Sequence, residues 1–219
     1  CFLSPLLSLL LIAGSSTALA DAKLPPNFTR EIVAGPEIRE PMDLAFAPDG
    51  AAWITSRTGE VWRLETGSLQ KHKVGKLDTD ASGDRGLHGI AFHPDFPRTP
   101  HLFLFHHAKD HAKGEYLSRV VRVDITGTGP NSRLDLASTK VLLEWTGDEG
   151  GQHVGGGLLA HPTERALYIS TGDNNKIWEL KQYYNDPKNR AQSTGDLRGK
   201  ALRIGFDGSI PPGNPFVGK

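Results

Sequence analysis

The segment GQHVGGG at residues 151–157 places one histidine, His153, among four glycines. An unperturbed imidazole titrates at a pH of about 6.5, so it can take a proton from a reacting hydroxyl near neutral pH. Glycines on both sides allow backbone and a flat ligand to approach the ring closely. The segment is also compatible with a histidine packed at the start of a strand, next to glycines that serve only turns.

A second candidate group is Asp84, in the segment DASGDRGLHG at residues 80–89. Its carboxylate would either hydrogen-bond a substrate hydroxyl or stabilise a cationic His153. A solvated aspartate in a turn has the same local sequence, so this alternative stays open. We expect Arg85, the next residue, to pair with Asp84 at the surface.

Two polar residues, Asp173 and Asn174, follow an apolar strand in the segment STGDNN. They either line a pocket or stabilise the turn. The long insertion after them, residues 176–196, either roofs the site with its aromatic side chains or buries them within itself. These aromatic residues are Trp178, Tyr183 and Tyr184.

The histidine-rich stretch at residues 101–115 contains His107 and His111, which are four residues apart as metal ligands on a helix often are. The stretch follows an apolar strand and has the composition of a hairpin loop, so we expect no metal site there. The sequence contains no glycine-rich phosphate loop, nucleophile elbow or dinucleotide-binding fingerprint.

Three copies of one sequence pattern predict the fold. Each copy has an apolar strand that ends in a proline-containing turn, a second β-rich run, and a strand with a central arginine. The copies lie at residues 43–65, 89–124 and 157–205. Three other histidines, His88, His93 and His161, fall near the turns of the copies, and we expect them to be structural.

A repeated four-stranded unit of about 40–50 residues is typical of a β-propeller blade, and an irregular β-sandwich is the alternative. We therefore predict an all-β propeller with about three blades. Because propellers close with about four to eight blades, we expect the sequence to be truncated at its C-terminus. Residues 28–35 alternate like a strand that would pair with a final blade.

The predicted organisation is a signal peptide at residues 1–20, an N-terminal strand and linker at 21–39, and a propeller domain at 40–219. The first segment is uncharged and apolar and ends in small residues, which indicates export to the periplasm or the medium and no stable membrane span after cleavage. Twenty-five basic and 25 acidic residues give no charge excess that would favour nucleic acid. The only cysteine, Cys1, lies in the leader, which excludes disulfides in the mature protein.

Three motifs, at residues 86–96, 153–162 and 197–216, resemble the glucose/sorbosone dehydrogenase family when they are taken in this order. They read GLHGIAFHPDF, HVGGGLLAHP and LRGKALRIGFDGSIPPGNPF. The resemblance implies a six-bladed propeller that oxidises sugars with pyrroloquinoline quinone and calcium. It also implies that the residues that clamp the quinone and bind calcium lie beyond residue 219.

The same resemblance implies that His153 is the general base, and that it lines the cofactor pocket together with Asp84, Gln152, Asp173 and Asn174. Two of these residues differ from the glucose enzymes, which are expected to carry glutamine at the position of Asp84 and aspartate at that of Gln152. Glucose itself is therefore not the expected substrate.

We predict oxidation of an aldose or polyol by hydride transfer to the quinone, with an external electron acceptor that reoxidises the cofactor. Two other functions remain open from the sequence. A propeller of this kind can serve as a non-catalytic binding module, and a similar ring can act as a calcium-dependent lactonase. The lactonase needs several carboxylate or amide ligands around the propeller axis, and no clear set is visible in the sequence.

Overall fold

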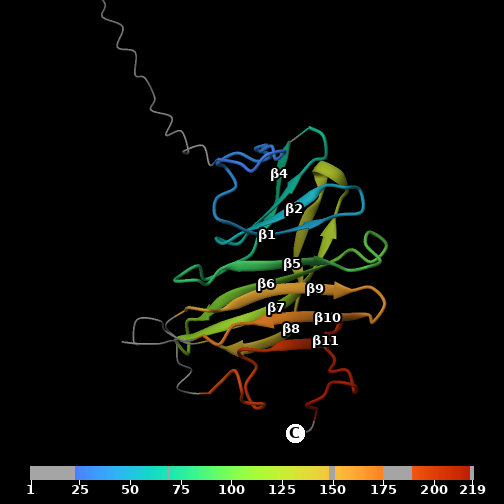
Figure 1. Cartoon of the computed structure of the whole chain (residues 1–219). Coiled ribbons are helices and arrows are strands. Elements are labelled where there is room, and N and C mark those ends of the chain that lie inside the picture. Colours follow the sequence, from blue (N-terminus) through green and yellow to red (C-terminus); the bar gives the residue numbers. More distant parts are fainter. Residues whose placement is uncertain (1–22, 69, 148–150, 175–188, 218–219) are drawn as a thin grey trace, which may run out of the picture. The chain divides into compact units, whose positions relative to one another are not determined.

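In a computed structural model of the protein, residues 23–68, 70–147, 151–174 and 189–217 are described. The chain forms two compact units, Cys1–Ile32 and Val33–Lys219. The described residues of the first unit lie in no strand or helix. All described strands therefore belong to the second unit (Figure 1).

The second unit contains three antiparallel sheets. The first sheet consists of β1 (Pro41–Phe46), β2 (Ala52–Ser56), β3 (Glu60–Leu64) and β4 (Lys71–Lys76). The second consists of β5 (Leu87–Phe92), β6 (His101–Asp110), β7 (Glu115–Thr126) and β8 (Arg133–Thr146), with a 3₁₀ helix, η1 (Gly129–Asn131), before β8. The third consists of β9 (Gly155–His161), β10 (Ala166–Thr171) and β11 (Ala201–Gly205). Over the described ranges, no helix has the length and apolar character to cross a membrane.

The three copies of the sequence pattern form equivalent strands of the three sheets. The copies at residues 43–65, 89–124 and 157–205 form β1–β3, β5–β7 and β9–β11, respectively. Consecutive antiparallel sheets built from one repeated unit confirm the prediction of an all-β, propeller-type fold. The pattern does not reveal β4 and β8, because these strands bury only one and two apolar side chains.

The first strands of the sheets are neighbours, since β5 contacts both β1 and β9. The main-chain N–H of Ile90 in β5 donates to the Asp43 carboxylate of β1 over 3.2 Å. On the other side, a Cβ atom on Gly89 would lie 2.1 Å from the carbonyl oxygen of Gly156 in β9. The backbones of β5 and β9 can therefore approach this closely only because residue 89 is glycine.

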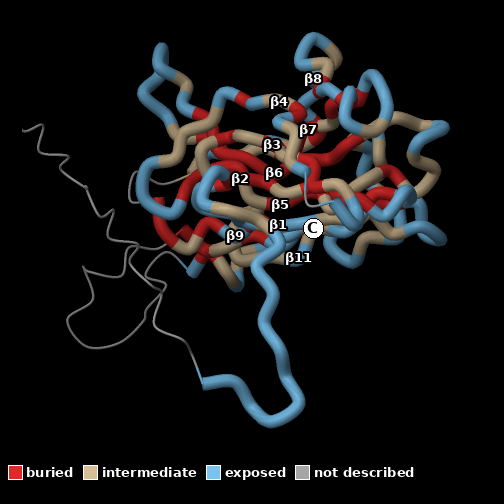
Figure 2. The backbone as a smooth tube through the Cα atoms, turned by 90° about the horizontal axis from the view of Figure 1, so that it is seen from above, coloured by how far each residue is buried: buried red, intermediate tan, exposed pale blue. Residues whose placement is uncertain are grey.

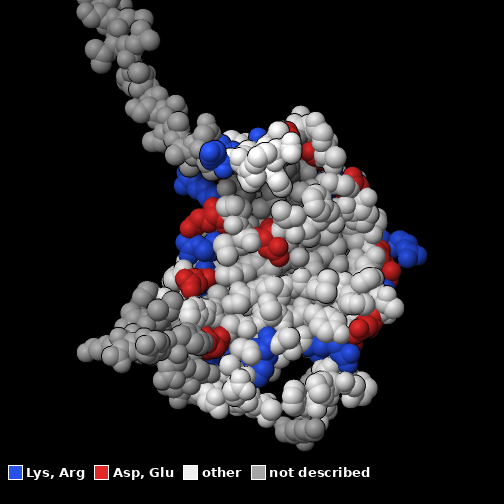
Figure 3. Space-filling view, viewed as in Figure 1, with Lys and Arg blue, Asp and Glu red and all other residues white. Residues whose placement is uncertain are grey.

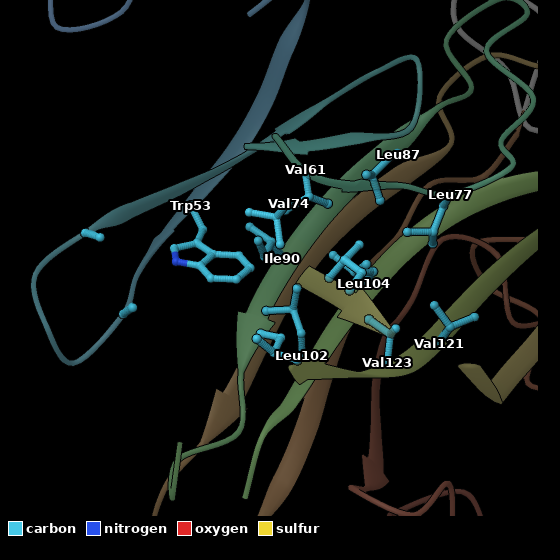
Figure 4. Close-up of a cluster of buried hydrophobic side chains, with 14 residues drawn as sticks. Trp53, Val61, Val74, Leu77, Leu87, Ile90, Leu102, Leu104, Val121 and Val123 are labelled. Carbon is cyan, nitrogen blue, oxygen red and sulfur yellow. The ribbon is translucent and has the colours of Figure 1, made fainter. Parts of the chain in front are cut away.

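The second sheet is buried on both faces. Successive side chains of β6 point to opposite faces of the sheet, and each face packs against a neighbouring sheet. Leu104 packs toward the first sheet in a cluster that includes Trp53 (Figure 4). Phe105 points the other way, into a cluster with Leu167 of the third sheet. Figure 2 shows the buried residues concentrated along the inner strands, with exposed loops around them. This arrangement explains why residues 102–105 of β6 form a continuous apolar run and not an alternating one.

The N-terminal segment forms no strand in the structure, and its pairing with a final blade stays a prediction. Residues 28–35 lie in no strand, and the Ile32 side chain is exposed. A single strand forms no ladder of hydrogen bonds, and no described strand pairs with this segment. The predicted leader at residues 1–20 lies outside the described residues, and the domain boundary at residue 40 remains a prediction.

The predicted hairpin loop after residue 105 is wrong, because β6 continues to Asp110 and pairs with β7 along its whole length. His106 and His107 are therefore strand residues, and both are buried. His111 lies in the turn that follows β6. The four-residue spacing of His107 and His111 is thus not a helical spacing.

The central arginine of each copy's last strand explains part of the repeat. In the first sheet Arg63 pairs with Asp49 of the turn over 2.8 Å, and in the third Arg203 pairs with Glu164 over 3.3 Å. These pairs connect the turn after the first strand to the third strand of the same sheet. On the face seen in Figure 3, basic and acidic side chains lie near one another and form no large patch of one sign.

Arg63→Met is expected to lower the free energy of unfolding by about 3 kcal/mol. The Arg63 side chain is 5% exposed and pairs with Asp49 and, over 2.6 Å, with Glu65, which is 17% exposed. The variant leaves the Glu65 carboxylate largely buried without this cation, which is costly. Urea unfolding followed by tryptophan fluorescence measures the loss.

Arg119→Met is the matched control. Arg119 pairs with Glu144, and the two side chains are 31% and 38% exposed. Exposed pairs contribute little, so the expected loss is below about 1 kcal/mol. Equal losses in the two variants would contradict the role assigned to Arg63.

The buried histidines of β6 predict a loss of stability in acid. Burial lowers the pKa of His106 to about 4 and that of His107 to about 3. In the unfolded chain the same rings bind protons below a pH of about 6.5, so the unfolded state binds more protons and is favoured as the pH falls. Between about pH 6 and pH 4, each ring is expected to lower the free energy of unfolding by up to about 1.4 kcal/mol per pH unit.

His107→Asn tests this expectation, because asparagine does not titrate. In the wild type, His107 Nδ1 lies 2.9 Å from the Gly86 carbonyl oxygen, and the asparagine side chain can replace this contact. Urea unfolding between pH 4 and pH 8 should give a smaller pH slope in the variant below about pH 6. Above about pH 7 the two slopes should agree. An unchanged acid slope would show that His107 does not contribute.

Candidate active site

His153 lies between β8 and β9, and contacts from two neighbouring sheets hold its backbone. Its N–H donates to the carboxylate of Asp84, before β5, over 3.1 Å. Its carbonyl oxygen accepts from the backbone N–H of Asn174, after β10, at 3.2 Å and from the Asn174 side-chain amide at 3.3 Å. The φ angle of His153 is +49°, a conformation that costs on the order of 1 kcal/mol in a residue other than glycine. These tertiary contacts therefore set the backbone, against its local preference.

The His153 ring faces the carboxylate of Asp173. Nδ1 lies 3.4 Å from Asp173 Oδ1, and the two side chains are 32% and 8% exposed. A buried carboxylate thus contacts an imidazole that stays accessible to a ligand. In such a pair the carboxylate keeps the proton of the neutral ring on Nδ1 and stabilises the imidazolium, so that Nε2 exchanges a proton with the ligand.

The glycines around His153 answer a steric need. A Cβ atom on Gly172 would lie 1.6 Å from the His153 carbonyl oxygen. Gly151 has a φ of +58°, and a Cβ atom there would lie 2.4 Å from Nη1 of Arg85. Gly155 is exposed, and a Cβ atom there would lie 2.4 Å from the Gly172 nitrogen. The glycines therefore serve both close approach and turns.

Arg85 lies beneath the His153 segment, so the predicted surface pair with Asp84 is wrong. Arg85 is 3% exposed, and its guanidinium carbon lies 3.6 Å from the centre of the Tyr116 ring. Its Nη1 donates to the Ser82 hydroxyl over 3.0 Å. The Asp84 N–H donates to the Gly151 carbonyl over 2.7 Å. The turn that carries Asp84 is thereby attached to the segment that carries His153.

Three of the predicted site residues, Asp84, Asp173 and Asn174, contact His153. Gln152 is adjacent to His153 in sequence and is buried, as are Asp173 and Asn174. Asp84 and His153 are the members of the set that a ligand can reach. The predicted aromatic roof cannot be placed, since Trp178, Tyr183 and Tyr184 lie outside the described residues.

Two further residues border the site without a signal in the sequence. Arg190, in the loop before β11, is buried and donates to the Asp173 carbonyl over 3.2 Å. His88 in β5 packs against the glycines, because a Cβ atom on Gly156 would lie 2.9 Å from His88 Nδ1. Burial lowers the pKa of His88, and its ring lies 5.2 Å from that of His107. Sequence alone does not distinguish these residues from ordinary loop and strand residues.

The described part of the site contains no cluster of metal-binding side chains. Within the described ranges, no three histidine, cysteine, aspartate or glutamate side chains come together as metal ligands. The His153 side chain is 32% exposed, and Gly155 is also exposed. Arg85 and Arg190 are buried beneath the site, so neither is exposed to clamp carboxylates of a ligand.

Comparison with known proteins identifies the family of the chain. The profile of the family described as Glucose / Sorbosone dehydrogenase matches residues 38–219. The chain is 28% identical over 223 residues to Quinoprotein glucose dehydrogenase B of Acinetobacter calcoaceticus, which covers 91% of this chain and 45% of the relative. It is 26% identical over 206 residues to the Hedgehog-interacting protein of Homo sapiens, covering 85% of this chain and 28% of that relative.

A solved structure shares the fold. The crystal structure of a putative oxidoreductase (glucose dehydrogenase) from Thermus thermophilus gives a TM-score of 0.68 at 30% identity, over 87% of this chain and 50% of that one. The chain thus spans about half the length of this structure and 45% of the Acinetobacter relative. Because the family match extends over most of the chain, the protein belongs to the glucose/sorbosone dehydrogenase family, as its motifs predict.

Proposed function

We propose that the whole protein oxidises a sugar by hydride transfer to pyrroloquinoline quinone, with His153 as the general base. The observation that carries this proposal is the 3.4 Å contact of His153 Nδ1 with the buried Asp173 carboxylate, beside exposed glycine backbone. Family membership supports the reaction class, and the name of the Acinetobacter relative supports the cofactor.

In this proposal Asp173 keeps the proton of neutral His153 on Nδ1. Nε2 then takes the proton of the anomeric hydroxyl while the carbon loses hydride, and the Asp173 carboxylate stabilises the resulting imidazolium. The sugar leaves as the lactone, having lost one proton and one hydride. The bound quinone supplies a two-electron acceptor, which an external electron acceptor regenerates.

Asp84 is the proposed contact to the sugar. Its Oδ2 accepts the His153 N–H, and its other oxygen can accept a hydroxyl of the substrate. Gln152 and Asn174 are buried, so they would act by holding the segment beneath the ligand. Because Asp84 and Gln152 differ from the residues expected in glucose enzymes, we propose an aldose or polyol other than glucose.

Two parts of the proposal rest on the sequence alone. The apolar residues 1–20 support a secreted or periplasmic location. Calcium would accompany the quinone, as the family resemblance implies, and we propose that its ligands lie outside the described residues. The second candidate function is a binding module, which the similarity to the Hedgehog-interacting protein favours.

His153→Gln is expected to lower kcat of the full-length protein by about 10²–10⁴-fold, because it removes the general base. Asp173→Asn keeps the shape of the side chain but removes the charge, and the expected loss is about 10²-fold. The measurement is dye reduction over a panel of sugars, with calcium and pyrroloquinoline quinone added to the apoprotein.

His161→Gln is the control, since His161 lies at the end of β9 and accepts the Glu164 N–H over 3.1 Å, away from the contacts of His153. It should retain the wild-type kcat. Full turnover in His153→Gln would reject the proposed base. Quinone binding without turnover in the wild type would support the binding module, and lactone hydrolysis without quinone would support a lactonase.

A further inference from the structure

Arg190 is a buried arginine next to the candidate site that the proposed mechanism does not use. It is 2% exposed. Its Nη1 donates to the carbonyl oxygen of Asp173 over 3.2 Å and to that of Asn174 over 3.5 Å. Burial of a guanidinium is costly and is tolerated only with well-placed acceptors. These two acceptors indicate one role of the residue.

The two carbonyl groups lie where regular backbone pairing has ended. β10 ends at Thr171, so Asp173 and Asn174 have left the sheet and its ladder of hydrogen bonds. Buried carbonyl groups need donors from elsewhere. A guanidinium provides several N–H groups in a fixed plane and can serve neighbouring acceptors together, which a lysine ammonium does less well. Arg190 thus replaces the sheet as the support of this backbone.

The residues that Arg190 supports are the two that contact His153 from the third sheet. The Asp173 carboxylate meets His153 Nδ1 at 3.4 Å, and the Asn174 amide donates to the His153 carbonyl over 3.3 Å. Asn174 has a φ of +58°, so its backbone is held in a left-handed conformation. A shift of this backbone would move both contacts to His153 at once.

Arg190 is itself fixed to the end of β10. Lys200 Nζ donates to the Arg190 carbonyl over 2.6 Å. The Lys200 N–H donates to the Thr171 hydroxyl over 2.9 Å, and the Thr171 N–H donates to the Lys200 carbonyl over 2.9 Å. The loop that carries Arg190 is therefore tied to the strand that leads into Asp173, which gives the guanidinium a defined position.

We propose that Arg190 is a positioning residue for His153. It fixes the backbone of Asp173 and Asn174, and thereby aims the Asp173 carboxylate at Nδ1 of the ring. Its effect on catalysis rests on the proposed function, in which His153 is the base. Its effect on the ring does not depend on that function.

Arg190→Met in the ¹⁵N-histidine-labelled full-length protein tests the proposal. The ring nitrogen shifts of His153, assigned with the His153→Gln variant, report which nitrogen carries the proton. We expect the Nδ1–H tautomer in the wild type and a mixture of both tautomers in Arg190→Met. In the sugar dehydrogenase assay, kcat should fall by about 10²-fold. KM should stay within about threefold, because Arg190 does not face the substrate.

Arg190→Lys keeps a buried cation but offers one compact donor group in place of the planar fork. We expect a smaller tautomer change than in Arg190→Met and a partial recovery of kcat. If Arg190→Met does not fold, the test rests on Arg190→Lys alone. The proposal then requires that the His153 ring nitrogen shifts of Arg190→Lys differ from those of the wild type.

Arg63→Met is the matched control, because it removes another buried arginine in the first sheet. It should leave the His153 ring shifts and kcat unchanged although it lowers stability. Wild-type ring shifts in both Arg190 variants would overturn the proposal, even if kcat falls. The two proposals can fail separately. If the wild type oxidises no sugar but Arg190→Met still loses the Nδ1–H tautomer of His153, the proposed function is rejected and the role of Arg190 is kept.

Discussion

The contact between the backbones of Gly89 and Gly156 is the constraint on which the candidate site depends. A Cβ atom at residue 89 would lie 2.1 Å from the Gly156 carbonyl oxygen, so the backbones of β5 and β9 come into contact at this point. Their neighbouring segments are then close enough for one residue, His153, to be held by Asp84 from one sheet and by Asn174 from the next. The site is therefore a product of sheet-to-sheet packing and not of one loop.

The core of the second sheet makes that packing rigid. Leu104 and Phe105 are neighbours in sequence, but they enter two different clusters, one shared with each adjacent sheet. Burial on both faces gives β6 a large share of the apolar surface removed from water, which is the main stabilising term in such a fold. A scaffold of this kind can hold an active-site segment in an unfavourable backbone conformation, because local relaxation would disturb well-packed neighbours.

The sequence predicts the parts of this structure that repeat or alternate, and it fails where a single tertiary contact decides. Apolar strands that end in proline turns predict the sheets, and the motifs around His153 predict the family. The extension of β6 is missed because His106 and His107 are polar in type, although their environment is apolar. Arg85 and Arg190 carry no local signal either. From sequence alone, a charged residue in a loop is predicted to be exposed, because its burial depends on backbone that only the structure shows.

The contacts around His153 come from buried groups on one side and from the exposed Asp84 on the other. Asp173 contacts the ring, and Arg190 supports the Asp173 backbone. Both residues are buried. The proposed contact with a ligand comes from the exposed Asp84. Its attachment to the His153 segment includes a main-chain N–H to the Gly151 carbonyl, which any residue except proline can supply. A substitution at position 84 would therefore keep the turn attached to the His153 segment, but it would remove both the proposed sugar contact and the carboxylate that accepts the His153 N–H.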